Sequence, residues 1–193
     1  IARTIDLTLT GRMMDSDECF RIGLINRIVP KEKVMEASLA LAGDGAHLDA
    51  AFAAADAIYL SGITLAILPE AGREALLSRL IAARAEGKLT AFDPNLRPKL
   101  WESSDAMRHW LTAAAKGAQI LLPSFEDDAT WFGDTSLSAC ASRWMEAGAT
   151  EVVVKNGGGT MACHTGDHYV EIEVERAAPI DTTGAGDSFN GGY

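Results

Sequence analysis

The residues best suited to catalysis stand in the stretch DTTGAGDSFNGGY at positions 181–193. Thr182 and Thr183 are good N-caps, so this stretch predicts the start of a helix. The first turn would consist of the small residues Gly184, Ala185 and Gly186. Such a turn leaves backbone N–H groups uncovered, and an anion can bind them at the positive end of the helix dipole. Asp187 follows, and its position fits two roles: a carboxylate that favours a helix N-terminus, or a general base beside a phosphate site.

Polar residues and glycines also follow each of the strands that the sequence predicts. Short apolar runs predict these strands at 57–62, 89–93, 118–123 and 151–155. In an open α/β sheet, ligands bind outside the carboxyl ends of the strands, so we expect the residues at these ends to converge with residues 184–187 on one crevice. They are Ser61, Gly62, Asp93, Pro94, Asn95, Pro123, Ser124, Lys155, Asn156, Gly157, Gly158 and Gly159.

The three consecutive glycines at 157–159 allow two interpretations. They let the backbone approach a ligand closely, or they form a flexible entry to a hairpin. The sequence has no GxxxxGK[ST] phosphate loop, and GGGT is not the GxGxxG pattern of a dinucleotide site. A phosphate-handling enzyme would therefore have to use the helix start at 184–186. Cys163, His164 and His168 flank a predicted turn, which denies them helical ligand spacing, so we expect no metal site there.

Helical patterns alternate with the predicted strands. They cover 70–87, 105–117 and 137–148, and each lies between two strands. This alternation predicts an α/β fold in which a mainly parallel sheet carries helices on both faces. After Lys155 the pattern changes to two alternating segments around a turn at 165–167, which predicts an antiparallel hairpin at the sheet edge.

The composition is typical of a globular protein. The 193 residues are 48% hydrophobic and 23% charged, enough for one domain with a sizeable core. The net charge of −10 argues against nucleic acid and against an anionic membrane as partners. We expect neither a membrane span nor a signal peptide, because we find no apolar run of about 18 residues and no basic leader. The three scattered cysteines are typical of reduced thiols, so we expect a cytoplasmic protein.

Charge and pattern divide the sequence near residues 39–46. Residues 1–42 hold six basic and six acidic side chains, so the whole net charge of −10 belongs to residues 43–193. A predicted helix ends near Gly43, and another begins near His47. We therefore expect two pieces, 1–42 and 43–193.

Four motifs in residues 43–193 resemble the ribokinase-like (PfkB) sugar kinases. The motifs are SGITLAIL, FDPNLRPKLW, LLPSFEDD and DTTGAGDSFNGGY, and they are similar to the C-terminal half of the 2-keto-3-deoxygluconate kinases in particular. The resemblance implies a ribokinase-like three-layer α/β/α fold with a mainly parallel sheet, incomplete in this chain. It also implies ATP-dependent phosphorylation of a hydroxyl on a small sugar acid, with ATP and Mg²⁺ as cofactors. A fructokinase-like or ribokinase-like preference is the nearest alternative for the sugar.

The same resemblance gives the glycine-rich turn its catalytic role. Asp187 would be the general base that takes the proton of the attacking sugar hydroxyl. The turn of Gly184, Ala185 and Gly186 would be the anion hole for the transferred phosphoryl group. Both roles agree with the general-base interpretation of Asp187, because phosphoryl transfer depends mainly on positioning and charge stabilisation.

Further residues acquire binding roles from the resemblance. Asn95 and Arg97 would lie between the nucleotide phosphates and the substrate, and the Arg97 fork suits the carboxylate of a sugar acid. Asp127 would contact Mg²⁺ through water, although this chain has Ser124 and Asp127 where many relatives have N-x-x-E. The nucleotide would be lined by Lys155, Gly157, Gly158 and Gly159.

Residues 1–42 resemble a different family, the crotonases (enoyl-CoA hydratases and isomerases), through LTGRMMDSDECFRIGLINRIVP. That family's oxyanion-hole glycines and catalytic carboxylates would lie before Ile1, so this piece offers no donors for a thioester enolate. The kinase family's N-terminal half and its segment after Tyr193 have no counterpart in the sequence. Three alternatives stay open: a kinase domain present as a fragment, a CoA-thioester hydratase or isomerase, and a non-catalytic fusion. We expect little or no kinase turnover from this chain alone, and a homodimer is an alternative for the full-length family member.

Overall fold

The computed structural model describes residues 17, 29–33, 45–174 and 184–193. By its contacts the chain divides into two units, Ile1–Leu48 and Asp49–Tyr193. The described residues of the first unit include a short 3₁₀ helix, η1 (Lys31–Lys33), and helix α4 (Gly45–Ala54) begins at the end of that unit. Most of the segment 1–42 lies outside the described residues, so the predictions made for it stay predictions.

The second unit is built on a six-stranded sheet whose strands lie in sequence order. The first four strands pair in parallel, and the last two add an antiparallel hairpin. The strands are β1 (Ala57–Ser61), β2 (Leu89–Asp93), β3 (Ile120–Leu121), β4 (Glu151–Val154), β5 (Met161–Thr165) and β6 (His168–Ile172). The predicted mainly parallel sheet and its edge hairpin are confirmed.

Strand β3 is shorter than the predicted segment 118–123. The N–H of Ala118 bonds back to the carbonyl of Ala115, and Pro123 has no N–H to donate to a neighbouring strand. The strands still meet beyond the regular ladder, because Lys155 N donates to the carbonyl of Pro123 at 2.8 Å. This bond keeps the carboxyl ends of β3 and β4 together.

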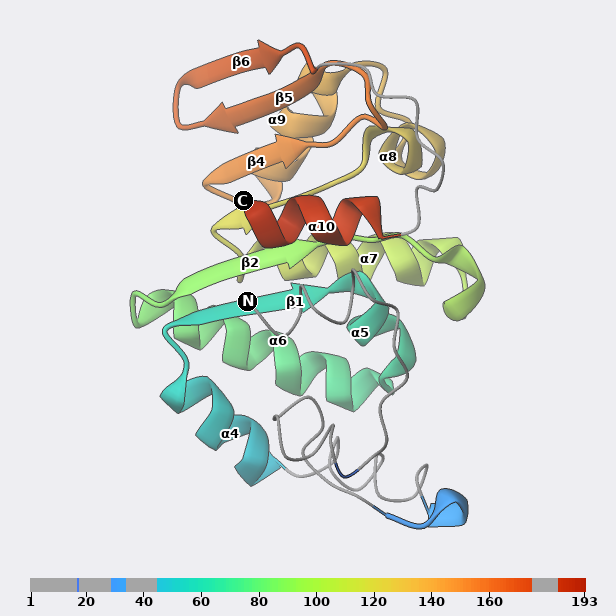
Figure 1. Cartoon of the computed structure of the whole chain (residues 1–193), viewed down its shortest axis with the longest axis vertical. Coiled ribbons are helices and arrows are strands. Elements are labelled where there is room, and N and C mark those ends of the chain that lie inside the picture. Colours follow the sequence, from blue (N-terminus) through green and yellow to red (C-terminus); the bar gives the residue numbers. More distant parts are fainter. Residues whose placement is uncertain (1–16, 18–28, 34–44, 175–183) are drawn as a thin grey trace. The chain divides into compact units, whose positions relative to one another are not determined.

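Helices connect the parallel strands and cover one face of the sheet (Figure 1). They are α5 (Gly62–Ile67), α6 (Glu70–Ala85), the 3₁₀ helix η2 (Pro98–Leu100), α7 (Ser104–Ala115), α8 (Phe125–Phe132) and α9 (Leu137–Ala147). Each crossover joins neighbouring parallel strands, and such crossovers are right-handed, so all of them fall on the same face. The core between helices and sheet includes the fully buried side chains of Leu65, Phe92, Met107, Leu121 and Trp144. No helix among the described residues has the length and apolarity needed to cross a membrane.

Helix α10 (Ala185–Gly192) lies against the opposite face of the sheet (Figure 1). Within the described part of the chain it forms that helical layer alone, so this face is only partly covered. Tyr59 and Leu89 on this face remain 49% and 48% exposed. The expectation of helices on both faces therefore holds, in the described residues, through α10 alone.

Gly62 at the start of α5 shapes the carboxyl end of β2. A Cβ at this position would lie 1.9 Å from the carbonyl oxygen of Pro94, far inside van der Waals contact. The missing side chain lets the first turn of α5 pack directly on the backbone that follows β2. Ser61 begins the helix, because its hydroxyl accepts a hydrogen bond from Ile63 N at 3.4 Å.

A buried ion pair joins α8 to α9. Asp128 is fully buried, and one of its carboxylate oxygens accepts from Arg143 and, at 2.8 Å, from Trp144 Nε1. Arg143 also binds Asp134 at 2.7 Å, and its guanidinium stacks on the rings of Phe132 and Trp144. Among the described residues, nothing donates to the second oxygen of Asp128. Burial therefore outweighs the positive neighbour and raises the pKa of Asp128 to about 6.

The stability of the chain should depend on the protonation of Asp128. In an unfolded chain an aspartate has a pKa of about 3.9, so the folded state binds more protons between about pH 4 and 6. The stability linked to this group is present below about pH 4 and is lost as the pH rises through about 6, by about 2–3 kcal/mol. Urea unfolding of the wild type and Asp128→Asn, compared at pH 4 and pH 7, checks this. The free energy of unfolding of Asp128→Asn, measured relative to the wild type, should be higher at pH 7 than at pH 4. The same difference at both pH values would show that Asp128 does not titrate in this range. Asp105→Asn, an exposed site, controls for the removal of one carboxylate.

Candidate active site

Helix α10 begins at the glycine-rich turn, as predicted. Its N-cap is Gly184, whose φ of 72° lies in the left-handed region that glycine adopts without strain. The carbonyl of Gly184 accepts the first helical hydrogen bond, from Ser188 N at 2.8 Å. The predicted caps Thr182 and Thr183 are wrong, because the left-handed turn that starts the helix comes later; both threonines lie outside the described residues. Asp187 lies in the first turn, and its side chain is exposed.

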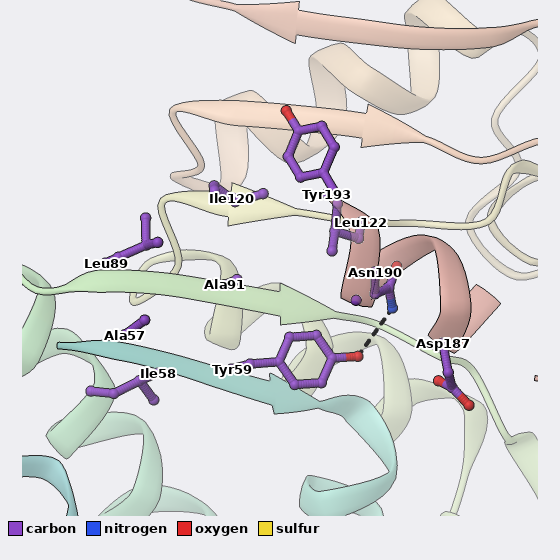
Figure 2. A pocket seen from close by; sticks show the side chains of 11 residues that line it. Ala57, Ile58, Tyr59, Leu89, Ala91, Ile120, Leu122, Asp187, Asn190 and Tyr193 are labelled. Carbon is purple, nitrogen blue, oxygen red and sulfur yellow. Dashed lines mark hydrogen bonds between the residues drawn. The ribbon is translucent and has the colours of Figure 1, made fainter. Parts of the chain in front are cut away.

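One polar network joins α10 to the carboxyl ends of β2 and β4. Lys155 Nζ lies 2.8 Å from Asp93 Oδ2 and 3.0 Å from Asn190 Oδ1. Asn190 Nδ2 donates to Asp93 Oδ2 at 2.5 Å and to the Tyr59 hydroxyl at 3.1 Å, the bond drawn in Figure 2. Lys155 and Asp93 are only 8% and 3% exposed, so their opposite charges neutralise each other away from water.

The local backbone fixes both charged residues. Asp93 ends β2, and its other carboxylate oxygen accepts from Asn95 N at 2.9 Å. This bond holds the turn after β2, where Asn95 has a φ of 35°, a left-handed value that asparagine tolerates. Lys155 lies directly after β4, and its carbonyl accepts from Phe125 N at 2.8 Å. The end of β4 thus places both the ammonium group and the first turn of α8, which carries Asp127.

The Lys155 ammonium group also lies beside the turn that starts α10. A Cβ at Gly186 would lie 3.8 Å from Lys155 Nζ. Asp93 offsets the charge of Lys155, but the ammonium group still places a charged hydrogen-bond donor next to the uncovered backbone amides, where an anion could use both. A Cβ at Gly184 would meet no described atom within 4 Å, so the other side of the turn is open. The turn can therefore receive an anionic group.

A cavity of about 590 Å³ lies between α10 and the sheet. Its walls are mostly apolar side chains from β1, β2 and β3, and the rest of the lining includes Asp187 and Asn190 of α10 and Tyr193 just after it (Figure 2). Burial, followed by the negative charges of Asp93 and Asp187, raises the pKa of the Tyr59 hydroxyl. The Asp187 carboxylate thus shares one electrostatic environment with the network at the strand ends.

Asp127 and Arg97 belong to the same environment. Burial raises the pKa of Asp127, the positive charges of Arg97 and Lys155 lower it, and the negative charges of Glu126 and Asp93 raise it again. Hydrogen bonds from Lys155 Nζ to Asp93 and from Phe125 N to the Lys155 carbonyl bring the end of β2, the start of α8 and the end of β4 together, as the sequence predicted. Arg97 itself is exposed, and one of its nitrogens donates to the carbonyl of Leu96 at 2.7 Å.

The triple glycine lies in the turn that joins β4 to β5. Gly157 and Gly158 have φ values of 51° and 87°, so both need the conformational freedom of glycine. Gly157 and Gly158 are exposed, whereas Gly159 is partly covered. This turn follows directly after Lys155, which belongs to the polar network with Asp93 and Asn190.

Asn190 and Tyr59 were not among the predicted site residues. Asn190 stands three residues after Asp187, so the two side chains belong to neighbouring positions on one helical face. That spacing was visible in the sequence. The partners were not, because Asn190 reaches residues that are 97 and 131 positions away along the chain.

Curated proteins similar to this chain are sugar kinases. The 2-dehydro-3-deoxygluconokinase of Dickeya dadantii (strain 3937) is 37% identical over 142 residues, which are 72% of this chain and 46% of that protein. A fructokinase of Rhizobium leguminosarum bv. trifolii is 35% identical over 121 residues, or 62% of this chain and 35% of that protein. The chain therefore spans about half the length, or less, of these relatives.

Solved structures agree with the predicted fold. A PfkB protein from Polaromonas sp. JS666 superposes with a TM-score of 0.63 at 28% identity, covering 73% of this chain and 46% of that one. The aminoimidazole riboside kinase of Salmonella enterica, solved with aminoimidazole riboside and an ATP analogue, gives 0.62 at 26% identity, covering 70% and 45%. The ribokinase-like α/β fold is thereby confirmed.

A sequence model of the pfkB family carbohydrate kinases matches residues 28–193. The match begins inside the segment 1–42, so the boundary placed near residue 43 and the crotonase resemblance before it stay predictions. Together with the fold and the curated relatives, the match over most of the sequence has one consequence: the chain belongs to the pfkB family of carbohydrate kinases.

Proposed function

We propose that this chain is the catalytic part of a kinase that transfers the γ-phosphoryl group of ATP to a hydroxyl of 2-keto-3-deoxygluconate (2-dehydro-3-deoxygluconate in the names of the relatives). The main support for this proposal is the start of α10. There the uncovered amides of residues 184–186, the Lys155 ammonium group and the Asp187 carboxylate lie at the carboxyl edge of the sheet. Phosphoryl transfer requires positioning and charge stabilisation rather than covalent catalysis. These groups can supply both.

Asp187 acts as the general base in this proposal. Its carboxylate takes the proton of the sugar hydroxyl while the hydroxyl oxygen bonds to the γ-phosphorus, and the bond from that phosphorus to the β–γ bridging oxygen breaks to release ADP. The amides of Gly184, Ala185 and Gly186 donate to the phosphoryl oxygens as their charge redistributes. Lys155 and the glycines 157–159 line the nucleotide.

Asp127 would be the residue that holds a divalent cation. Burial raises the pKa of Asp127, the charges of Glu126 and Asp93 raise it further, and Arg97 and Lys155 lower it; a bound cation would favour the ionised carboxylate. Magnesium prefers oxygen ligands and often reaches a protein carboxylate through water. When bound with the nucleotide, Mg²⁺ neutralises phosphate charge, and Asp127 would hold it through a water molecule.

The proposal that the substrate is a sugar acid rests on Arg97. The side chain is exposed on the turn after β2, next to Asn95, and a guanidinium fork matches a carboxylate with two parallel hydrogen bonds. A sugar acid carries that carboxylate, whereas fructose does not. Names of relatives support both substrates, since they include 2-dehydro-3-deoxygluconokinases and fructokinases. A homodimer and a cytoplasmic location stay predictions.

The thioester alternative gains no support from the described residues. A crotonase-type site needs two donors aimed at an enolate oxygen. Of the segment 1–42, only residue 17 and residues 29–33 are described, and η1 within them has no buried residue that could line such a site.

The proposed function is tested by ADP release from Mg-ATP with 2-keto-3-deoxygluconate, fructose and ribose in parallel. Two proteins are compared: the chain as printed, and a restored protein in which the parts of the Dickeya dadantii relative outside the match are added to it. We expect the restored protein to turn over the sugar acid at about 1–100 s⁻¹, the usual range of kinases, and well above fructose. We expect little turnover from the printed chain. Preference for fructose would overturn the substrate, and no turnover with any sugar would overturn the proposal.

A further inference from the structure

We propose that Asn190 is a positioning residue that fixes α10 to the ends of β2 and β4. By binding Asp93 and Lys155 it sets where Asp187 and the amides of residues 184–186 lie. Its catalytic meaning rests on the proposed function, but the contact itself can be tested without any catalysis.

The chemistry of the partners calls for an amide at this position. Lys155 can only donate, so it faces the amide oxygen of Asn190, at 3.0 Å. The Asp93 carboxylate can only accept, so it faces the amide nitrogen, at 2.5 Å. The same nitrogen reaches the Tyr59 hydroxyl at 3.1 Å. An apolar or singly charged side chain would leave one of two nearly buried charges without this partner, which is costly.

Apolar packing does little to hold this part of α10. The helix has no buried residue, and a cavity of about 590 Å³ is lined by one side of it together with the strands. Gly191 and Gly192 contribute no side chains at its end. There the Tyr193 hydroxyl donates to Glu151, beyond the last turn. Among the described residues, the side-chain hydrogen bonds of Asn190 are therefore those that join α10 to the sheet nearest the turn at 184–186.

Because Asn190 and Asp187 lie on the same short helix, the contact of Asn190 with the sheet also determines where Asp187 lies. The two residues are three positions apart, so they share one face of a short helix (Figure 2). A rotation or shift of α10 that breaks the Asn190 contact must also displace Asp187 and the turn before it. Displacements of about 1 Å can lower a transfer rate by about 10²-fold, so a weak anchor here would be costly.

Amide hydrogen exchange on the chain as printed tests the contact. Asn190→Ala should lower the protection factors of residues 188–193, whose amides begin with the first helical bond at Ser188 N, by about 10-fold or more, because two hydrogen bonds to charged groups are lost. Ser188→Ala is the matched control, since that side chain is exposed on the same helix. We expect it to retain wild-type protection, and the strands should keep theirs in both variants. Wild-type protection of α10 in Asn190→Ala would overturn the proposal.

Asn190→Asp provides a signature that packing alone would not produce. The new carboxylate replaces a donor with an acceptor, facing Asp93 on β2, Lys155 on β4, Tyr59 on β1 and Asp187 on α10 itself. At pH 7.5 the two facing carboxylates should repel, and protection should fall by about 10-fold or more. Such pairs share a proton at raised pKa, so protection should recover toward the wild type near pH 5. Protection factors correct for intrinsic exchange, and the same pH profile as the wild type would contradict the proposal.

Nucleotide titration separates this inference from the proposed function. Mg-ATP should bind Asn190→Ala about 3–10-fold more weakly than the wild type, if the turn is displaced as proposed. If the wild type binds no Mg-ATP, the proposed function fails for this chain, and the exchange experiment still decides the role of Asn190. If α10 loses protection but Mg-ATP affinity is unchanged, the contact is structural and the positioning role is overturned.

Discussion

Replacement of Asp187 by asparagine should lower kcat of the restored protein by about 10²–10⁴-fold, the usual cost of losing a general base. Asparagine keeps the size of the side chain and its fit to a helix start, but it cannot take a proton at neutral pH. The affinity for Mg-ATP should survive or rise, because one negative charge leaves the anion site while the amides of 184–186 stay in place. Coupled ADP-release kinetics and calorimetric titration measure the two quantities.

A melting curve of Asp187→Asn is the necessary control. A residue that only favours the helix N-terminus should lower the melting temperature when replaced and leave kcat almost unchanged, since its free-energy contribution is about 0.3–1 kcal/mol. A general base should show the reverse. Normal turnover by a less stable variant would identify Asp187 as a helix-start residue and refute the mechanism.

Replacement of Arg97 by glutamine should raise KM for 2-keto-3-deoxygluconate by about 10–100-fold in the restored protein. Hydrogen bonds to charged groups contribute about 1.5–3 kcal/mol, which corresponds to that range. Turnover of fructose, which has no carboxylate, should hardly change, so the preference for the acid should collapse. Arg97→Lys keeps the charge but loses the two-pronged geometry, and we expect an intermediate KM.

The comparison of two sugars distinguishes the two roles considered for Arg97. If the guanidinium binds nucleotide phosphates instead, Arg97→Gln should raise KM for ATP and impair both sugars equally. That result would leave the kinase mechanism intact and remove the argument for a sugar acid.

Local patterns were enough to predict most of the second unit. The strands β1, β2 and β4 fall on the predicted apolar runs, because a strand packed against helices needs apolar side chains along its length. The helices α6, α7 and α9 lie within or next to their predicted ranges, since their caps and periodicity are encoded within about ten residues. Strand β3 was overestimated because proline and the end of α7, not hydrophobicity, limit its pairing.

Long-range contacts set the part of the site that the sequence did not predict. The spacing of Gly184, Gly186 and Asp187 is local, and so the turn could be recognised. The network around it joins Asp93 to Lys155 across 62 residues and to Asn190 across 97. A pattern within one segment cannot predict partners that lie so far away in the sequence. Asp93 itself was indicated as a functional residue, because it stands at the end of a strand. The left-handed cap at Gly184 was missed because threonine is preferred over glycine as an N-cap, and the sequence offers two threonines just before it.

NMR on the chain as printed can decide whether the start of α10 binds the transferred phosphoryl group. The amide resonances of Gly184, Ala185 and Gly186 are followed while a non-hydrolysable Mg-ATP analogue is added, with AMP as the control that lacks the γ-phosphate. We expect the ATP analogue to shift these three amides in a saturable way and AMP to leave them almost unchanged. If the analogue binds elsewhere on the chain and the resonances of these amides do not shift, the turn is not the anion site and the proposed mechanism is wrong.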